Sequence, residues 1–110
     1  MIRDDAVYIA DIIESIQIID EHINGKSEAD FEHSLLLQDA VYRRFEIIGE
    51  AATKISDKLK DAHPEVEWRL MKLMRNKLIH EYFGISATSV FATIKEDLPQ
   101  LLAKIKQISY

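Results

Sequence analysis

Apolar residues recur every three or four positions along most of this chain, which is the spacing of one buried face of an α-helix. The pattern is clearest from Arg3 to Asn24, where the periodic residues are isoleucines and Gly25 follows as a stop signal. Isoleucine is β-branched and favours strands, but the helical period outweighs that preference. The segment NGKSEAD should form the first loop. The stripe consists of Ile9, Ile12, Ile13, Ile16, Ile19 and Ile23.

A second, longer helix is expected from about Phe31 to Lys60, again from its periodic apolar stripe. The tripeptide HPE then breaks the chain, and Pro64 is well placed just before or at the start of a helix. The stripe of this second helix consists of Leu37, Ala40, Val41, Ile47, Ile48, Ala51, Ala52, Ile55 and Leu59.

A third helix should follow the proline and end near Phe83 and Gly84. Ser86 is a suitable N-cap for a last helical region over 87–108, which Pro99 should kink or split. The apolar positions of the third helix are Val66, Trp68, Leu70, Met71, Leu73, Met74, Leu78 and Ile79.

Composition agrees with one all-α domain over residues 1–110. Three Gly, two Pro and no alternating apolar segment argue against a sheet. The absence of cysteine excludes disulfides and a thiol nucleophile and suits a reducing cytoplasm. Two acids precede the first apolar run, so we expect no signal peptide, and no run is long enough to cross a membrane. A chain this short buries a modest fraction of its surface, so dimerisation would help it.

The charges are unevenly distributed. A net charge of −5 makes the chain a poor general binder of nucleic acid, so any such role requires a local patch. No acid lies between Glu67 and Glu81. Composition alone favours a solvated face paired with acids from another helix. We call this window the basic island; it holds Arg69, Lys72, Arg75 and Lys77, with His80 at its end.

The octapeptide RNKLIHEY lies in the basic island and carries the candidate chemistry. His80 could transfer protons near neutral pH, Arg75 could bind a phosphate through its fork of donors, and Asn76 could orient either group. Alternatively, His80 and Tyr82 only cap or pack the helix end. On an ideal helix, positions 75 and 80 point about 140° apart. Convergence therefore requires a distorted helix or two copies of the motif that meet across a dimer.

Other polar residues give weaker signals. Glu46 and Glu50 lie one turn apart and could form a carboxylate site, but salt bridges to Arg43 or to the basic island are favoured. Arg43 and Arg44 could extend an RNA-binding surface, on charge alone. No glycine-rich phosphate loop is present. No metal site is expected, because the histidines lack partners at metal-binding spacing; these are His22, His33 and His63.

RNKLIHEY matches the R-x-x-x-x-H-x-Y signature of the HepT toxins, a branch of the HEPN superfamily. The segments DAVYRRFEIIGEAATKIS and HPEVEWRLMKLMRNKLIHEYFGIS resemble the second and third helices of that family. The likeness runs roughly from Arg3 to Leu102. It implies an all-α, up-and-down, four- to five-helix HEPN-like bundle that forms a homodimer.

The resemblance also implies an activity. Members are metal-independent endoribonucleases without cofactors and act as toxins of type II toxin–antitoxin pairs. By motif position, Arg75 and His80 would be catalytic in a cleft shared by two protomers, and Asn76 would support the arginine. A ribose 2′-hydroxyl would attack the adjacent phosphodiester and give a 2′,3′-cyclic phosphate, so DNA should resist. Weaker RNA contacts would come from Arg69, Lys72, Lys77, Arg43 and Arg44.

The motif tyrosine has a separate implied role. HepT-like proteins are commonly paired with a minimal nucleotidyltransferase antitoxin, which transfers AMP to the tyrosine that corresponds to Tyr82. A bulky anionic group beside His80 would block the cleft and repel RNA. The alternative is a non-catalytic helical module that docks the nucleotidyltransferase, for which an intact arginine–histidine pair is not needed.

Overall fold

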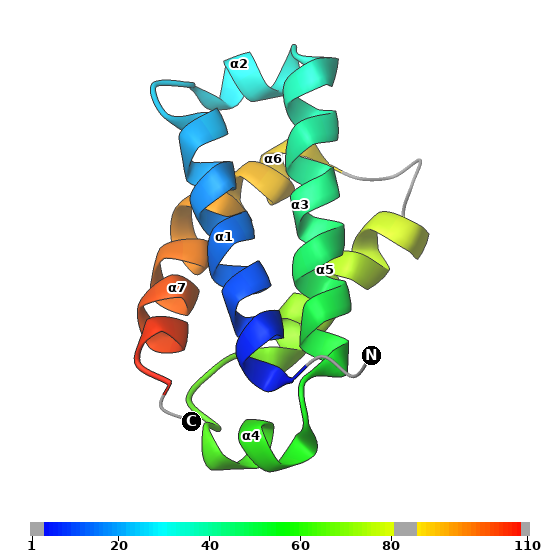
Figure 1. Ribbon diagram of the computed structural model, residues 1–110. Coiled ribbons are helices and arrows are strands. Elements are labelled where there is room, and N and C mark those ends of the chain that lie inside the picture. The colour runs from blue at the N-terminus through cyan, green and yellow to red at the C-terminus, as the bar shows by residue number, and fades with distance from the viewer. Residues whose placement is uncertain (1–3, 81–85, 109–110) are drawn as a thin grey trace.

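The computed structural model describes residues 4–80 and 86–108, and for 76–80 it describes the backbone alone. Its long helical segments alternate in direction, as Figure 1 shows: α1 runs up, α3 down, α5 up, and the α6–α7 region down again. The expected all-α bundle is thus confirmed. The helices are α1 (Asp5–Ile23), α2 (Glu28–Glu32), α3 (Leu35–Lys54), α4 (Asp57–Ala62), α5 (Trp68–His80), α6 (Ala87–Ala92), the π-helical segment η1 (Thr93–Asp97) and α7 (Leu98–Lys106).

The first helix follows its sequence pattern closely. Asp4 caps α1 by accepting a hydrogen bond from the Val7 backbone N–H, at 3.2 Å. Gly25 follows the helix with a φ of 75°, a left-handed conformation that suits glycine. The isoleucine stripe faces the core, and its fully buried members are Ile9, Ile12, Ile16, Ile19 and Ile23.

The expected second helix from Phe31 to Lys60 is wrong at its N-terminal end. Phe31 belongs to the short helix α2, which includes part of the expected NGKSEAD loop, and α3 begins only after Ser34. Ser27 and Asp30 form a reciprocal capping box that starts α2. Gln38 then reaches back from α3 and donates to the carbonyl of Phe31 at 2.9 Å, which stabilises the corner between the two helices.

The same expectation also fails at the C-terminal end, because Ser56 interrupts the helix. The Ser56 hydroxyl accepts from the Leu59 N–H and caps α4, so α3 and α4 are separate helices. Asp5 accepts from the Ser56 N–H at 2.9 Å and from its hydroxyl at 2.6 Å, tying the start of α1 to the start of α4. These two hydrogen bonds hold the pKa of Asp5 below its usual value.

The last helical region matches expectation more closely. The Ser86 hydroxyl accepts from the Ser89 N–H at 3.3 Å and caps α6. Pro99 lies in the first turn of α7, directly after the π-helical segment η1. Proline has no N–H to continue the α-helical ladder, and a wider turn before it accommodates that loss.

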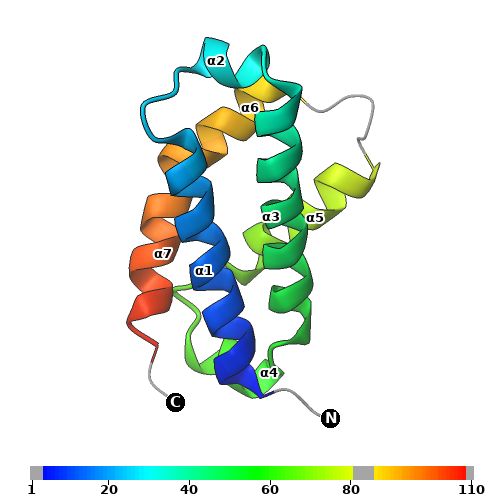
Figure 2. The same ribbon diagram turned by 45° about the horizontal axis from the view of Figure 1, so that its top comes forward.

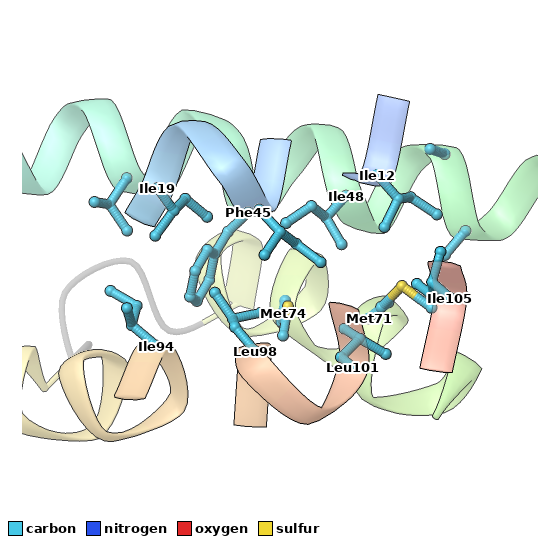
Figure 3. Close-up of a cluster of buried hydrophobic side chains, with 14 of the residues drawn as sticks. Ile12, Ile19, Phe45, Ile48, Met71, Met74, Ile94, Leu98, Leu101 and Ile105 are labelled. Carbon is cyan, nitrogen blue, oxygen red and sulfur yellow. The ribbon is translucent and has the colours of Figure 1, made fainter. Parts of the chain in front are cut away.

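The core fills the space between α1, α3, α5 and the η1–α7 region (Figure 3). Met71 and Met74 of α5 are buried in it, beside Ile48 of α3 and Leu101 of α7. Trp68 is half-buried, and its indole N–H donates to the His63 carbonyl at 3.0 Å. Both methionines are therefore packing residues, as their sequence spacing indicated. No helix within the described ranges has the length and apolarity needed to span a membrane.

Among the described residues, the most extensive helix–helix contacts are those of α1 with α3 and of α3 with α5. Gly49 lies where α3 meets α5. A Cβ at this position would collide with the Arg75 Cβ and come within 3.0 Å of the Met71 carbonyl oxygen. The missing side chain therefore lets the two helix backbones touch at Arg75.

Gly49→Ala is expected to destabilise the protein by about 1–3 kcal/mol, because the methyl group must push α3 and α5 apart. Elsewhere in a helix this change stabilises by about 0.5–1 kcal/mol, so the sign is diagnostic. Urea unfolding followed by circular dichroism measures it. Glu46→Ala, an exposed site on the same helix, is the control. A Gly49→Ala protein as stable as the parent would contradict the close contact.

Candidate functional site

The helix α5 carries the first part of the motif and remains α-helical through His80. The backbone therefore does not bend between the arginine and the histidine. Positions 75 and 80 then lie about 140° apart around the helix, as an ideal α-helix requires. Arg75 and His80 could meet at one site through a distorted helix or across a dimer. The backbone of α5 does not supply the distortion.

Arg75 lies at the contact between α5 and α3. Its backbone faces Gly49, and its guanidinium Nε is ion-paired with a carboxylate oxygen of Glu50. The two side chains are 33% and 49% exposed, so the pair is open to solvent. The sequence-based preference for a salt bridge from Glu50 to the basic island is confirmed. Arg75 is thus half-buried, anchored at Nε, and accessible to a further anion.

Two more members of the basic island line a groove between α3 and α5. Arg69 and Lys72 are exposed on α5, and Lys60 of α4 joins them. The groove has a volume of about 410 Å³. Lys72 and Arg75 are three residues apart, so the groove lies one helical turn from the anchored arginine. The remaining lining residues are Ala52, Thr53, Trp68 and Leu73.

The two arginines of α3 are placed differently. Arg43 lines a separate groove of about 380 Å³ on the α1 side of α3, with Tyr8 and Asp11. Arg44 is half-buried and lines neither groove. The structure therefore does not bring Arg43 together with Arg69 and Lys72 in one groove.

The rest of the motif lies outside the described part of the molecule. The side chains of Asn76, Lys77 and His80 are not described, and Tyr82 lies in the undescribed range 81–85, as does the expected end of the third helix at Phe83 and Gly84. Their roles stay predictions. Among the described residues, no three His, Asp or Glu side chains form a group that could hold a metal ion.

The middle of α5 also presents an apolar side chain to solvent. Leu73 is 50% exposed, and it precedes position 80 by seven residues, so both positions share one helix face. In Figures 1 and 2 the C-terminal part of α5 extends past α3, away from α7. The motif-bearing end of the helix thus projects from the bundle, about two turns beyond an exposed leucine.

Gly49 is the site residue that the sequence pattern did not single out. The signal was available: a lone glycine inside a strongly periodic helix usually has a packing reason. Its neighbour Glu50 is expected from charge alone to pair with Arg43 or with the basic island, without a link to the glycine before it. The neighbours Gly49 and Glu50 say more about the site than the pair of Glu46 and Glu50 does. Gly49 allows the close helix contact, and Glu50 forms an ion pair with Arg75 across it.

An all-α bundle that carries an R-x-x-x-x-H spacing at the projecting end of its third long helix defines a HEPN-like domain. The chain belongs to the ribonuclease HepT-like family, because the sequence profile of that family matches residues 12–108. No solved structure gives a significant match.

Named relatives agree with this family. The chain is 43% identical over 101 residues to a "Probable ribonuclease HepT" of Thermococcus cleftensis, covering 92% of each chain. It is 35% identical over 101 residues to a "Putative RNase" of Caldanaerobacter subterraneus subsp. tengcongensis, covering 92% of this chain and 90% of the relative. It also matches 49% of a longer "Gamma-glutamylcyclotransferase and putative RNase" of Methanocaldococcus jannaschii, at 38% identity over 98% of this chain.

Proposed function

We propose that this chain is a metal-independent endoribonuclease that acts as the toxin of a type II toxin–antitoxin pair. The observation that carries the proposal is Arg75: a solvent-accessible arginine, anchored at the α3–α5 contact and followed five residues later by a histidine. The names of the relatives support ribonuclease activity. An accessible arginine and a histidine are groups of the kind that phosphodiester cleavage needs.

In the proposed reaction, His80 accepts the proton of a ribose 2′-hydroxyl. The oxygen attacks the adjacent phosphorus, and the bond from phosphorus to the 5′-oxygen breaks as the protonated His80 gives its proton to that oxygen. The products are a 2′,3′-cyclic phosphate and a 5′-hydroxyl. Arg75 stabilises the negative charge that develops on the phosphoryl oxygens, and Asn76 supports the arginine.

The proposed active form is a homodimer. Because α5 is regular through His80, Arg75 and His80 of one chain sit on different helix faces. A second copy, related by a two-fold axis, supplies the same pair in reverse and brings arginine and histidine to one cleft. The exposed Leu73, on the face of position 80, gives such an interface an apolar contact.

The decisive test is RNA cleavage by the purified chain in excess EDTA. The parent should cleave RNA and leave cyclic phosphate ends, and His80→Ala and Arg75→Ala should each lower the rate by about 100-fold or more. An oligonucleotide with 2′-O-methyl groups is the substrate control and should resist. Cleavage that survives in both variants, or that EDTA abolishes, would contradict the proposal. A folded, dimeric, unmodified and inactive parent would favour the docking module instead.

The groove between α3 and α5 is proposed to hold the RNA backbone beside the reacting phosphate. Arg69→Ala and Lys72→Ala should raise KM more than they lower kcat, since these side chains bind substrate without reacting. Each lost phosphate contact should flatten the salt dependence of RNA affinity by about 0.7 in log–log slope. Fluorescence anisotropy at several salt concentrations measures it. Lys106→Ala, an exposed cation of α7, is the control; an equal effect there would contradict a specific track.

The proposed regulation is AMP transfer to Tyr82 by a minimal nucleotidyltransferase antitoxin. Incubation of the chain with the nucleotidyltransferase and ATP should add one AMP mass to the Tyr82 peptide and stop RNA cleavage. Tyr82→Phe should still cleave RNA but escape silencing. Tandem mass spectrometry and the cleavage assay report the two effects. Silencing of Tyr82→Phe to the same extent as the parent would show that the tyrosine is not the acceptor.

A further inference from the structure

Glu50 has no part in the proposed reaction, yet it is the described partner of the proposed catalytic arginine. It follows Gly49 on α3, and its carboxylate pairs with the Nε of Arg75 on α5. Gly49 brings the two backbones together, so the short reach of a glutamate is enough to span the helix contact. Gly49 and Glu50 thus act on Arg75 in different ways. Gly49 sets the position of its backbone, and Glu50 holds its side chain.

Stability alone does not account for this pair. Glu50 is 49% exposed and Arg75 is 33% exposed, and ion pairs that water reaches contribute little to folding. Orientation is a better use. An arginine side chain has many rotamers, and it loses this conformational freedom when its guanidinium is aligned on a phosphate. A carboxylate fixed on the neighbouring helix can remove part of that freedom before substrate arrives.

The contact at Nε is compatible with phosphate binding. A guanidinium has a second edge, formed by its two Nη groups, which can make a bidentate contact with a phosphate while a carboxylate bonds to Nε. The carboxylate therefore need not leave for the phosphate to bind. Glu50 could instead compete with RNA for the arginine. In that case, removal of Glu50 should raise RNA affinity and the cleavage rate, whereas removal of a residue that orients Arg75 should lower the rate.

We propose that Glu50 is a positioning residue, which holds Arg75 through Nε so that its Nη edge faces the scissile phosphate of RNA. The proposal rests on the ribonuclease function proposed above. It assigns Glu50 no contact with substrate. Its effect should therefore appear in kcat more than in KM, and only while Arg75 is present.

The kinetic test compares Glu50→Ala, Glu50→Gln and Glu46→Ala. Glu50→Ala should lower kcat by about 10- to 100-fold, as misplaced catalytic groups do, with KM within about threefold of the parent. Glu50→Gln keeps an oxygen that can accept from Nε and should retain kcat within about threefold to fivefold. Glu46→Ala removes the same charge from an exposed position one turn away on α3 and should leave kcat unchanged. In an Arg75→Ala background, Glu50→Ala should have no further effect.

A second readout is independent of catalysis. The Nε–H resonance of Arg75, assigned by its loss in Arg75→Lys, should be sharp in the parent and in Glu46→Ala. It should broaden or shift toward free arginine in Glu50→Ala. Unchanged kcat in Glu50→Ala, or a gain in RNA affinity and rate, would overturn the proposal, as would an unchanged Nε–H signal. A parent that cleaves no RNA overturns the proposed function instead, and the Nε–H signal still decides whether Glu50 holds Arg75.

Discussion

The close contact of α3 and α5 at Gly49 is the constraint on which the rest of this molecule depends. It is possible only because position 49 has no side chain, since a Cβ there would collide with the Cβ of Arg75. The contact fixes the position of α5 along α3 and its rotation about its own axis. The buried face of α5 places Met71 and Met74 in the core. The same contact fixes the backbone of the arginine that opens the motif. Packing and proposed chemistry thus share one residue pair, and a change at Gly49 should affect both.

The contact of α3 with α5 leaves a group of cationic side chains exposed. An acidic chain with a net charge of −5 presents cations where α5 borders α3: Arg69 and Lys72 line a groove, and Arg75 lies one helical turn beyond Lys72. The helix stays regular through His80, so one protomer keeps its arginine and histidine on different faces. In the proposed homodimer, the projecting end of α5 and the exposed Leu73 contact the partner copy that completes the site.

Most of the fold was predictable, because helical periodicity reports directly on which face is buried. The isoleucine stripe of α1, Gly25 as its stop and Ser86 as a cap all reflect local chemistry. The helix expected from Phe31 to Lys60 failed because apolar spacing continues across Ser34 and Ser56, whose hydroxyls cap new helices. The pairing of Glu50 with the basic island was predictable from charge. The role of Gly49 was not, since a close approach of two helices depends on tertiary packing that a local pattern does not contain.

In the proposed homodimer, each site takes its arginine from one chain and its histidine from the other, because helix geometry keeps the two apart within one chain. Mixing Arg75→Ala with His80→Ala protein tests it most directly. Each variant alone should be inactive. The two-fold axis gives the parent dimer two composite sites, each with the arginine of one chain and the histidine of the other. After subunit exchange, half of the dimers are mixed and each keeps one of its two sites intact, so RNA cleavage should return to about a quarter of the parent rate. If mixing restores no cleavage although mass spectrometry shows that mixed dimers have formed, arginine and histidine act within one chain, and the shared site is wrong.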